Sequence, residues 1–304
     1  MNVYDITLFG LHFRINPVAF TIPIGNGWNV YWYGIIVATG FLLAILYGYK
    51  KAKDYKINTD RMTDVILITT PLAVLCARAY YVIFDGSPIH SIKEFFGFSS
   101  SSGFAGIAIY GGVIGALLVG SLACFWRKIK VLDMYDLTLT AFLIGQGVGR
   151  WGNFVNQEAY GAFTGSTFWG MQSNRTILEM GEGLVHPCFL YESIWCIAGF
   201  FVLNKISKRR KFSGQIALCY GIWYGFGRGI IELMRTDSLM LGPIRVSSLL
   251  SFVACIACAV IMAVILKRQK AKEKDEDYTP VFDLETDENR QEEVKEGEDI
   301  EQTD

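Results

Sequence analysis

The sequence contains few charged residues for its length. Only 19% of its 304 residues are Asp, Glu, Lys or Arg, and before residue 270 most of them lie in short clusters between long apolar runs. Soluble globular domains carry about 25% charged residues, spread over their surface. The scarcity and clustering of charge therefore exclude a soluble enzyme built around one central core.

Histidine is scarce, and cysteine is not arranged for chemistry. The histidines His12, His90 and His186 are scattered, so no metal-ligand spacing is present, and we expect neither a metal nor a cofactor. The seven cysteines are odd in number, and six lie inside apolar runs, where cysteine packs as a small hydrophobe. No disulfide framework follows, and Cys255-x-x-Cys258 is expected to be a packing feature.

The first 30 residues lack a basic start and a continuous apolar stretch, and they contain Pro17 and Pro23. We therefore expect no cleavable signal peptide. Trp28 and Tyr33 mark the place where aromatic rings settle at a membrane interface. Residues 1–30 are expected to form an external amphipathic arm.

In place of charge, the sequence has seven long apolar runs. A bilayer core of about 30 Å needs about 20 helical residues, and none of the runs alternates as a barrel strand would. Backbone groups in lipid must be satisfied internally, so each run should be a helix. The sequence thus predicts an all-α integral membrane protein with seven transmembrane helices. The predicted spans are 31–49, 63–84, 106–126, 133–149, 188–204, 214–233 and 246–266.

Lys and Arg gather in alternate connections, at 50–61, 127–130, 205–211 and 267–272. The positive-inside rule makes these connections cytoplasmic. The N-terminus is then outside, the C-terminus is cytoplasmic, and the Gly-, Ser-, Thr- and Asn-rich segment 150–187 is an external loop at headgroup level.

Residues 271–304 have a different composition, with 15 acidic and 4 basic residues against a net charge of −1 for the whole chain. Such a segment cannot bury a core, so we expect a disordered cytoplasmic tail without a catalytic role. The predicted domains are the external arm 1–30, the seven-helix catalytic domain 31–270 and the acidic tail 271–304.

Four predicted spans carry ionisable or polar residues near their external ends, where each charge costs about 2.5–3.5 kcal/mol to insert. Taken singly, each is as well explained by an ordinary ion pair or by snorkelling to the headgroups. Taken together, they favour a shared cavity, and guanidiniums flanked by glycines suit a phosphate at headgroup depth. The residues are Arg78; Arg150, Asn153, Asn156 and Glu158; His186 and Glu192; and Tyr224, Arg228 and Glu232.

A run of glycines crosses the third predicted span. Gly111-x-x-x-Gly115 is typical of close helix packing, which is the more ordinary interpretation. The functional alternative is that Tyr110, just before the glycine pair, presents its phenol to a cavity.

The segment GRWGNFVNQEAYG, residues 149–161, resembles the G-R-x-G-N-F-x-N-x-E-x-x-G signature of bacterial prolipoprotein diacylglyceryl transferases. Every fixed position matches. The resemblance continues through Tyr31–Gly34, Tyr110–Gly112, His186-Pro187 with Tyr191-Glu192, and Gly227-Arg228 with Glu232, and it covers about residues 28–265.

This resemblance implies a multi-pass enzyme of the bacterial cytoplasmic membrane. Such an enzyme moves the diacylglyceryl group of phosphatidylglycerol onto the thiol of the lipobox cysteine of a preprolipoprotein, forming a thioether and releasing glycerol phosphate. The implied partners are phosphatidylglycerol, preprolipoprotein signal peptides with a lipobox cysteine, and the membrane. No nucleic acid is implied.

The reaction is a substitution in which a phosphate leaves, so charge stabilisation and alignment carry most of the barrier. We expect Arg150 and Arg228 to bind the phosphate, with Glu158 and Glu232 orienting the arginines. Asn153 and Asn156 hold headgroup hydroxyls or the loop. Further lipid-binding positions implied by the resemblance are Tyr33, Gly161, His186 and Tyr224.

Tyr110 departs from the family pattern, because many members have His-Gly-Gly where this chain has Tyr110-Gly111-Gly112. That histidine is favoured as a base, and this chain lacks it. The Tyr110 phenol could serve instead, Glu158 or His186 could accept the proton, or position 110 could only orient the headgroup. The base stays open at this point.

Two other classes compete with an enzyme. A secondary transporter for an anionic substrate would also carry intramembrane Arg and Glu, but no internal repeat is evident and seven spans do not divide into equal halves. A structural or receptor-like protein would not need polar clusters from four spans on one side.

Overall fold

The structure is a computed structural model, and the chain divides into two compact units, Met1–Cys258 and Ala259–Asp304. The predicted acidic tail from residue 273 onward lies outside the described residues, so its disorder and the domain boundaries stay predictions. The described residues are 3–23, 27–85, 95, 108–236, 240–241 and 244–272.

Each of the seven predicted ranges holds a long helix. The helices extend beyond several of the predicted ends because polar residues continue them by a turn or more; α5, for example, includes the glycine-rich segment up to Val155. A short 3-10 helix, η1 (Ala52–Tyr55), follows the first of them. The long helices are α1 (Trp32–Lys51), α2 (Thr59–Asp85), α4 (Ile109–Trp126), α5 (Val131–Val155), α7 (Cys188–Ser207), α8 (Gln215–Met234) and α9 (Val246–Lys272).

Four stretches of helix are long and apolar enough to cross a membrane: Trp32–Tyr55, Thr59–Phe84, Cys188–Ser207 and Val246–Ala271. The most apolar 18-residue window of Val246–Ala271 has none of its residues buried, as expected of a helix that faces lipid. The chain is thus a mostly helical membrane protein. α4 is apolar but shorter, and α5 and α8 carry charged residues, so the seven-span count and the orientation remain predictions.

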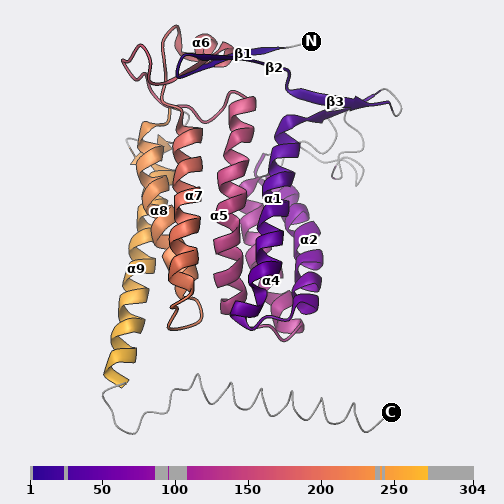
Figure 1. Cartoon of the computed structure of the whole chain (residues 1–304), viewed down its shortest axis with the longest axis vertical. Coiled ribbons are helices and arrows are strands. Elements are labelled where there is room, and N and C mark those ends of the chain that lie inside the picture. The colour runs from indigo at the N-terminus through magenta and orange to yellow at the C-terminus, as the bar shows by residue number, and fades with distance from the viewer. Residues whose placement is uncertain are drawn as a thin grey trace. The chain divides into compact units, whose positions relative to one another are not determined.

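Small residues let the helices of the first unit pack closely. α5 packs against α1, α7 and α8, and α2 packs against α4 (Figure 1). A Cβ atom on Gly111 would lie 2.3 Å from the Cβ atom of Tyr80, and one on Gly115 would lie 2.5 Å from that of Cys76. The packing interpretation of Gly111-x-x-x-Gly115 is therefore confirmed, because α2 fills the space that side chains would need.

The prediction of an all-α protein is incomplete, because two β-hairpins occupy the predicted external arm. β1 (Tyr4–Leu8) pairs with β2 (Leu11–Ile15), and β3 (Val18–Ile22) pairs with β4 (Trp28–Tyr31), both antiparallel. The first hairpin turns at Phe9-Gly10, both at positive φ, which is the geometry of a tight two-residue turn.

A small sheet caps one end of the helices. β1 also pairs with β5 (Met171–Ser173), which leads into the short helix α6 (Asn174–Met180). We call β1, β2, β5 and α6 the head, and the end of the helices beneath it the head end (Figure 1). Between α8 and α9 lies a pair of antiparallel strands of two residues each, β6 (Met240–Leu241) and β7 (Ile244–Arg245).

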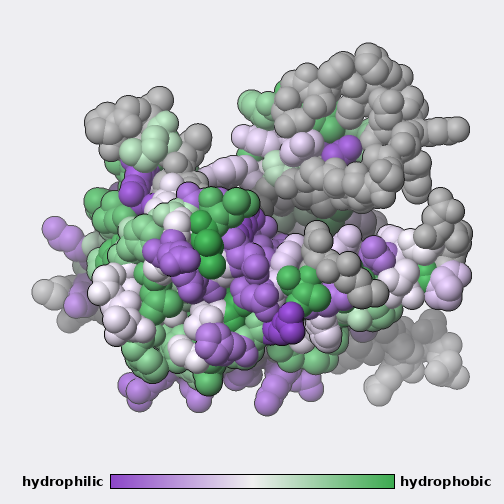
Figure 2. All heavy atoms as spheres, turned by 90° about the horizontal axis from the view of Figure 1, so that it is seen from above, coloured by the Kyte–Doolittle hydropathy of each residue, from purple (hydrophilic) through white to green (hydrophobic). Residues whose placement is uncertain are grey.

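Alternation along β1 fastens the head to the bundle. Ile6 and Leu8 are buried against Phe154 of α5 and Phe189 of α7. Asp5 and Thr7, which precede them in the strand, lie on its opposite face. Viewed from the head side, hydrophilic side chains gather over the middle of this face, among hydrophobic ones (Figure 2). Because Ile6 and Leu8 pack against Phe154 at the end of α5, the head also holds the segment that follows this helix.

Candidate active site

Polar residues from α5, α7 and α8 meet at the head end. α5 reaches it with its C-terminal turns, α7 with its first turns, and α8 with its last turns. Their packing brings together three of the four polar clusters expected from the sequence. The fourth, Arg78 of α2, instead donates its Nε hydrogen to the Phe95 carbonyl oxygen, 3.0 Å away.

Glu192 is the centre of this cluster. Its carboxylate is almost fully buried and forms ion pairs with Arg150 of α5 and Arg228 of α8. Arg235, just after α8, lies 3.7 Å from the same carboxylate. One carboxylate on α7 therefore joins guanidiniums of two other elements, and its burial makes each pair stronger than a surface ion pair.

Glu232 is the second carboxylate of the cluster. Its Oε2 atom lies 2.6 Å from Nη2 of Arg228, one turn earlier on α8, and 3.9 Å from Nε of Arg235. Arg228 is thus held between two carboxylates, Glu192 and Glu232. The expectation that Glu232 orients an arginine agrees with this geometry.

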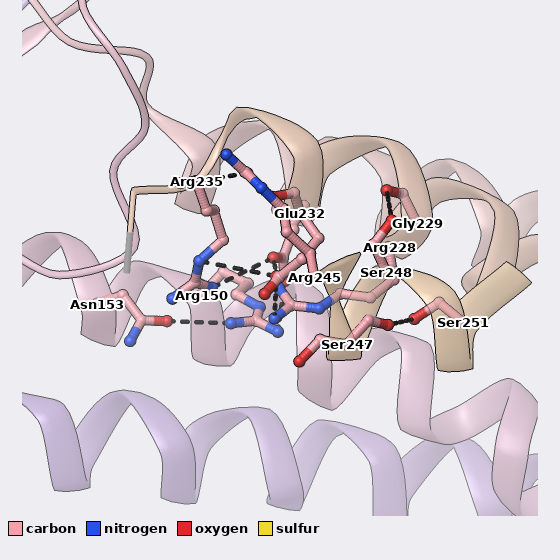
Figure 3. A network of polar contacts seen from close by, with 11 residues as sticks. Arg150, Asn153, Arg228, Gly229, Glu232, Arg235, Arg245, Ser247, Ser248 and Ser251 are labelled. Atoms are coloured by element: carbon pink, nitrogen blue, oxygen red, sulfur yellow. Dashed lines mark hydrogen bonds and ion pairs between the residues drawn. The ribbon is translucent and has the colours of Figure 1, made fainter. Parts of the chain in front are cut away.

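Arg245, the last residue of β7, closes the cluster. It donates to the backbone carbonyl oxygens of Glu232 and Arg235, at 2.5 and 2.7 Å. The first lies in the last turn of α8 and the second directly follows this helix, and a cation there opposes the negative end of the helix dipole. Arg245 therefore fixes the end of α8, which carries Glu232 and Arg235 (Figure 3).

Among the described residues of this cluster, guanidiniums outnumber carboxylates. Arg150, Arg228 and Arg235 lie within ion-pair distance of the Glu192 or Glu232 carboxylate, whereas Arg245 donates to backbone carbonyl oxygens. We call these six residues the arginine cluster. All four arginines are at least half-buried, so solvent screens their positive charge poorly. Such a site favours an anion, and a phosphate suits the planar forks of the guanidiniums.

Glu158 lies beside the arginine cluster rather than in it. The Arg150 guanidinium reaches the Asn153 side-chain oxygen at 3.5 Å, and the Asn153 amide donates to Glu158 at 3.2 Å. On its other side Glu158 lies 3.7 Å from Arg175 of α6. Glu158 thus reaches Arg150 through the amide of Asn153, and the expectation that it orients the arginines stays a prediction.

Arg175 links this segment to the head. Its backbone N–H donates to the buried Gln157 side chain at 2.9 Å, and its guanidinium donates to Glu179 at 2.8 Å. The hydrogen bond to Glu179 raises the pKa of Arg175 above its usual value. The head thus holds residues 157 and 158 in place through a permanently charged side chain.

The turn after α5 is strained and tightly packed. Gln157 and Ala159 both have positive φ, which costs non-glycine residues energy and persists only where packing demands it. A Cβ atom on Gly161 would lie 2.5 Å from the Met234 carbonyl oxygen, so only glycine fits between this turn and the end of α8. Gly161 therefore serves packing and leaves no side chain to contact a lipid.

The remaining predicted lipid-binding residues surround the cluster at different distances. The ring of Tyr33 lies over Gly152 of α5, and Tyr224 lies one turn before Arg228, with its ring stacked on Tyr220. Asn156 is the C-cap residue of α5. His186 contacts the Tyr191 hydroxyl at 3.1 Å and takes no part in the ion pairs of the cluster.

Tyr110 lies at the first turn of α4, the helix that packs against α2. It is 57% exposed, and none of the ion pairs and hydrogen bonds described above includes it. The structure therefore does not bring Tyr110 into the arginine cluster. Its proposed functional role rests on the sequence resemblance.

Glu192, Arg235 and Arg245 complete the cluster. The sequence places Glu192 among the polar residues of the expected cavity but does not single it out as a site residue, and it does not indicate Arg235 or Arg245. The ordinary interpretation of Glu192, an ion pair with a neighbour in the bundle, agrees with its contacts to Arg150 and Arg228. A sequence signal for Arg235 and Arg245 exists. The connections on their side of the predicted topology contain few Lys and Arg, so two arginines in one of them indicate a specific role.

Comparison with known proteins decides the family. The family model of prolipoprotein diacylglyceryl transferases matches residues 17–265. The chain belongs to this family. The predicted resemblance is thereby confirmed, together with the prediction of a transferase, and a transporter is not supported.

Curated relatives agree over most of their length. Proteins of Limosilactobacillus reuteri (strain DSM 20016) and Clostridium novyi (strain NT) are each 39% identical, covering 86% and 83% of this chain and 94% and 95% of the relatives. One of Streptococcus sanguinis (strain SK36) is 40% identical over 85% of this chain and 97% of its own length. All three are named phosphatidylglycerol--prolipoprotein diacylglyceryl transferase.

Proposed function

We propose that this chain transfers the diacylglyceryl group of phosphatidylglycerol to the thiol of a lipobox cysteine in a preprolipoprotein. The cysteine sulfur forms a bond to a glycerol carbon, and the carbon–oxygen bond to the phosphate breaks. The products are a thioether and glycerol phosphate. The observation that carries the proposal is the buried Glu192 carboxylate, which brings the guanidiniums of Arg150 and Arg228 together at the head end.

Arg150 and Arg228 bind the phosphate and stabilise the negative charge that the leaving oxygen gains. Arg150 belongs to the signature segment and Arg228 to the residues over which the resemblance continues, and both are held by the buried carboxylate of Glu192. A guanidinium that is already oriented by an ion pair does not need to reorganise when charge develops, which is the main source of electrostatic catalysis.

The proton of the thiol passes to Glu158, whose carboxylate is 40% exposed and can exchange protons with water. Asn153 positions this carboxylate beside Arg150. A few per cent of free cysteine is already thiolate at neutral pH, and the cationic cluster raises that fraction. Tyr110 takes an orienting role toward the headgroup.

The chain spans the bacterial cytoplasmic membrane seven times, with the N-terminus outside and the C-terminus in the cytoplasm. Two features support this topology: the seven helices and the clustering of Lys and Arg in alternate connections. It places the head and the arginine cluster at the outer leaflet, where the cysteine of an exported preprolipoprotein arrives. Residues 1–30, 31–270 and 271–304 are then arm, catalytic domain and tail.

The test is a reconstituted transfer reaction. The purified protein receives phosphatidylglycerol and a peptide with a lipobox cysteine, and the lipidated peptide and glycerol phosphate are quantified together. Equal amounts of both products are expected. A peptide with serine in place of the cysteine is the control, and unchanged phosphatidylglycerol in the complete reaction contradicts the proposal.

A further inference from the structure

Two tryptophans join α7 to α8 by reciprocal hydrogen bonds. The indole N–H of Trp195 donates to the backbone carbonyl oxygen of Trp223 at 2.9 Å, and the indole N–H of Trp223 donates to that of Trp195 at 3.0 Å. The two rings stack with their centroids 4.4 Å apart and an angle of 18° between their planes. We call this pair the tryptophan clasp.

Each indole occupies the space above a glycine of the facing helix. A Cβ atom on Gly227 would lie 2.1 Å from Nε1 of Trp195, and one on Gly199 would lie 2.3 Å from Nε1 of Trp223. In both helices the glycine follows the tryptophan by four residues, so a W-x-x-x-G pattern meets a second copy of itself. This double fit specifies one register of the two helices.

The clasp adjoins the arginine cluster. Glu192 lies three residues before Trp195 on α7, and Arg228 directly follows Gly227 on α8. A slip of one residue moves a helical side chain by about 1.5 Å along the axis and about 100° around it. Such a slip would separate the carboxylate of Glu192 from the guanidinium of Arg228.

We propose that Trp195 and Trp223 are positioning residues, which hold Glu192 and Arg228 in contact by fixing the register of α7 and α8. The inference rests on the role proposed for Arg228. The fit of each indole over a glycine favours one register through close packing. The two half-buried indole N–H groups add to this preference, since another register separates them from their carbonyl acceptors.

The first experiment replaces each indole in the full-length protein, reconstituted with phosphatidylglycerol. Trp195→Phe and Trp223→Phe should each lower turnover at saturating lipid by about 10-fold or more, because small misplacements of reacting groups are costly. The matched control is Trp126→Phe, at the exposed end of α4, which should keep its turnover. Full turnover in both clasp variants overturns the inference.

The second experiment separates positioning from general loss of structure. In Glu192→Gln the ion pair is already broken, so adding Trp195→Phe should lower the residual turnover by less than about twofold. Two independent, multiplying losses overturn the inference. The stacked indoles should also give a circular dichroism couplet that either single variant abolishes, and its absence from the unaltered protein counts equally against the clasp.

A third variant keeps the ring and removes only the donor. Benzothienylalanine at position 195 retains a bicyclic ring without an N–H group, so the chain should fold normally while turnover falls several-fold, as expected for one lost buried hydrogen bond. Unaltered protein that makes no lipidated peptide would contradict the proposed function. Active unaltered protein with a fully active position-195 analogue would contradict only the clasp.

Discussion

Two buried ion clusters lie at opposite ends of α5, and they are built differently. At the head end, the guanidiniums of Arg150, Arg228 and Arg235 share the carboxylates of Glu192 and Glu232, and Arg245 donates to backbone carbonyl oxygens. At the other end, Asp133 and Asp136 share one guanidinium, that of Arg210 in the connection between α7 and α8, at 2.6 and 3.0 Å. The first cluster has an excess of cations and the second an excess of acceptors.

The second cluster is satisfied by the protein itself. Asp136 is fully buried and also accepts the backbone N–H groups of Gly214 and Ala217 at the start of α8, at 2.9 and 2.8 Å. A carboxylate at this position caps the helix and complements its dipole. The Arg210 guanidinium lies over the ring of Tyr55, 4.6 Å from its centroid. No additional ion is required there.

The two clusters contain similar residue types, but their different partners distinguish ion pairs that stabilise the fold from ion pairs that serve function. A buried charge is retained for stability where the protein completes its partners, as around Asp136. A cluster in which several buried guanidiniums gather around few carboxylates, as at the head end, suits an anionic ligand. The following predictions test this contrast, beginning with the largest effect.

Removing the buried carboxylate of Asp136 should lower the stability of the fold without changing the catalytic rate of the folded protein. Asp136→Ala leaves two helix N–H groups without their acceptor and Arg210 with Asp133 alone, and it should lower the free energy of unfolding by about 3 kcal/mol or more. Turnover per folded molecule should stay within about twofold, because Arg150 lies about 20 Å further along α5. Thermal unfolding and activity are measured on the same sample. Asp60→Ala, at an exposed position, is the control.

Replacing the arginines of the head end should do the reverse. Arg150→Lys and Arg228→Lys keep the charge but lose the planar fork, so turnover should fall by about 10²-fold while membrane levels and thermal stability change little. Arg14→Lys, on exposed strand β2, is the matched control and should remain fully active. Turnover like that of the unaltered protein in both cluster variants would contradict the phosphate assignment.

Tyr110 lies outside the arginine cluster, and its substitution tests whether it takes part in the same reaction. If the phenol orients the headgroup, Tyr110→Phe should weaken phosphatidylglycerol binding by about 1 kcal/mol and leave turnover at saturating lipid nearly intact. Turnover is measured against lipid concentration at two pH values about one unit apart. A fall of about 10²-fold at saturating lipid would instead make the phenol the base.

The acidic tail should have the smallest effect. In the predicted topology it lies on the side of the membrane opposite to the proposed site, so a chain truncated after Lys270 should insert and transfer diacylglyceryl groups at the normal rate. Quantitative blotting of membranes together with the transfer assay checks this. Normal membrane levels with lost activity would assign the tail a role.

The sequence predicts the helices well because lipid imposes their length. It misses the hairpins of residues 4–31, although Tyr4, Ile6 and Leu8 alternate and Gly10 marks a turn, because β1 is buried by residues of β5, α5 and α7 that lie far away in the sequence. The sequence alone therefore predicts only an amphipathic arm for these residues.

Site residues can be predicted from sequence where a charged residue lies in an apolar run. They cannot be predicted where helix packing decides which residue becomes the ion-pair partner. Arg150, Arg228 and Glu232 are identified from sequence because ionisable groups at membrane depth need a reason. The central role of Glu192 depends on α5, α7 and α8 meeting at one point. Local spacing reports pairs one turn apart, such as Arg228 and Glu232, and cannot report pairs between helices.

The most direct test of the arginine cluster is a structure with phosphatidylglycerol bound. The account predicts phosphate oxygens within hydrogen-bonding distance of Arg150 and Arg228, with Glu192 still holding both guanidiniums from behind. A phosphate bound elsewhere, with the four arginines in contact only with Glu192, Glu232 and backbone carbonyls, would contradict it.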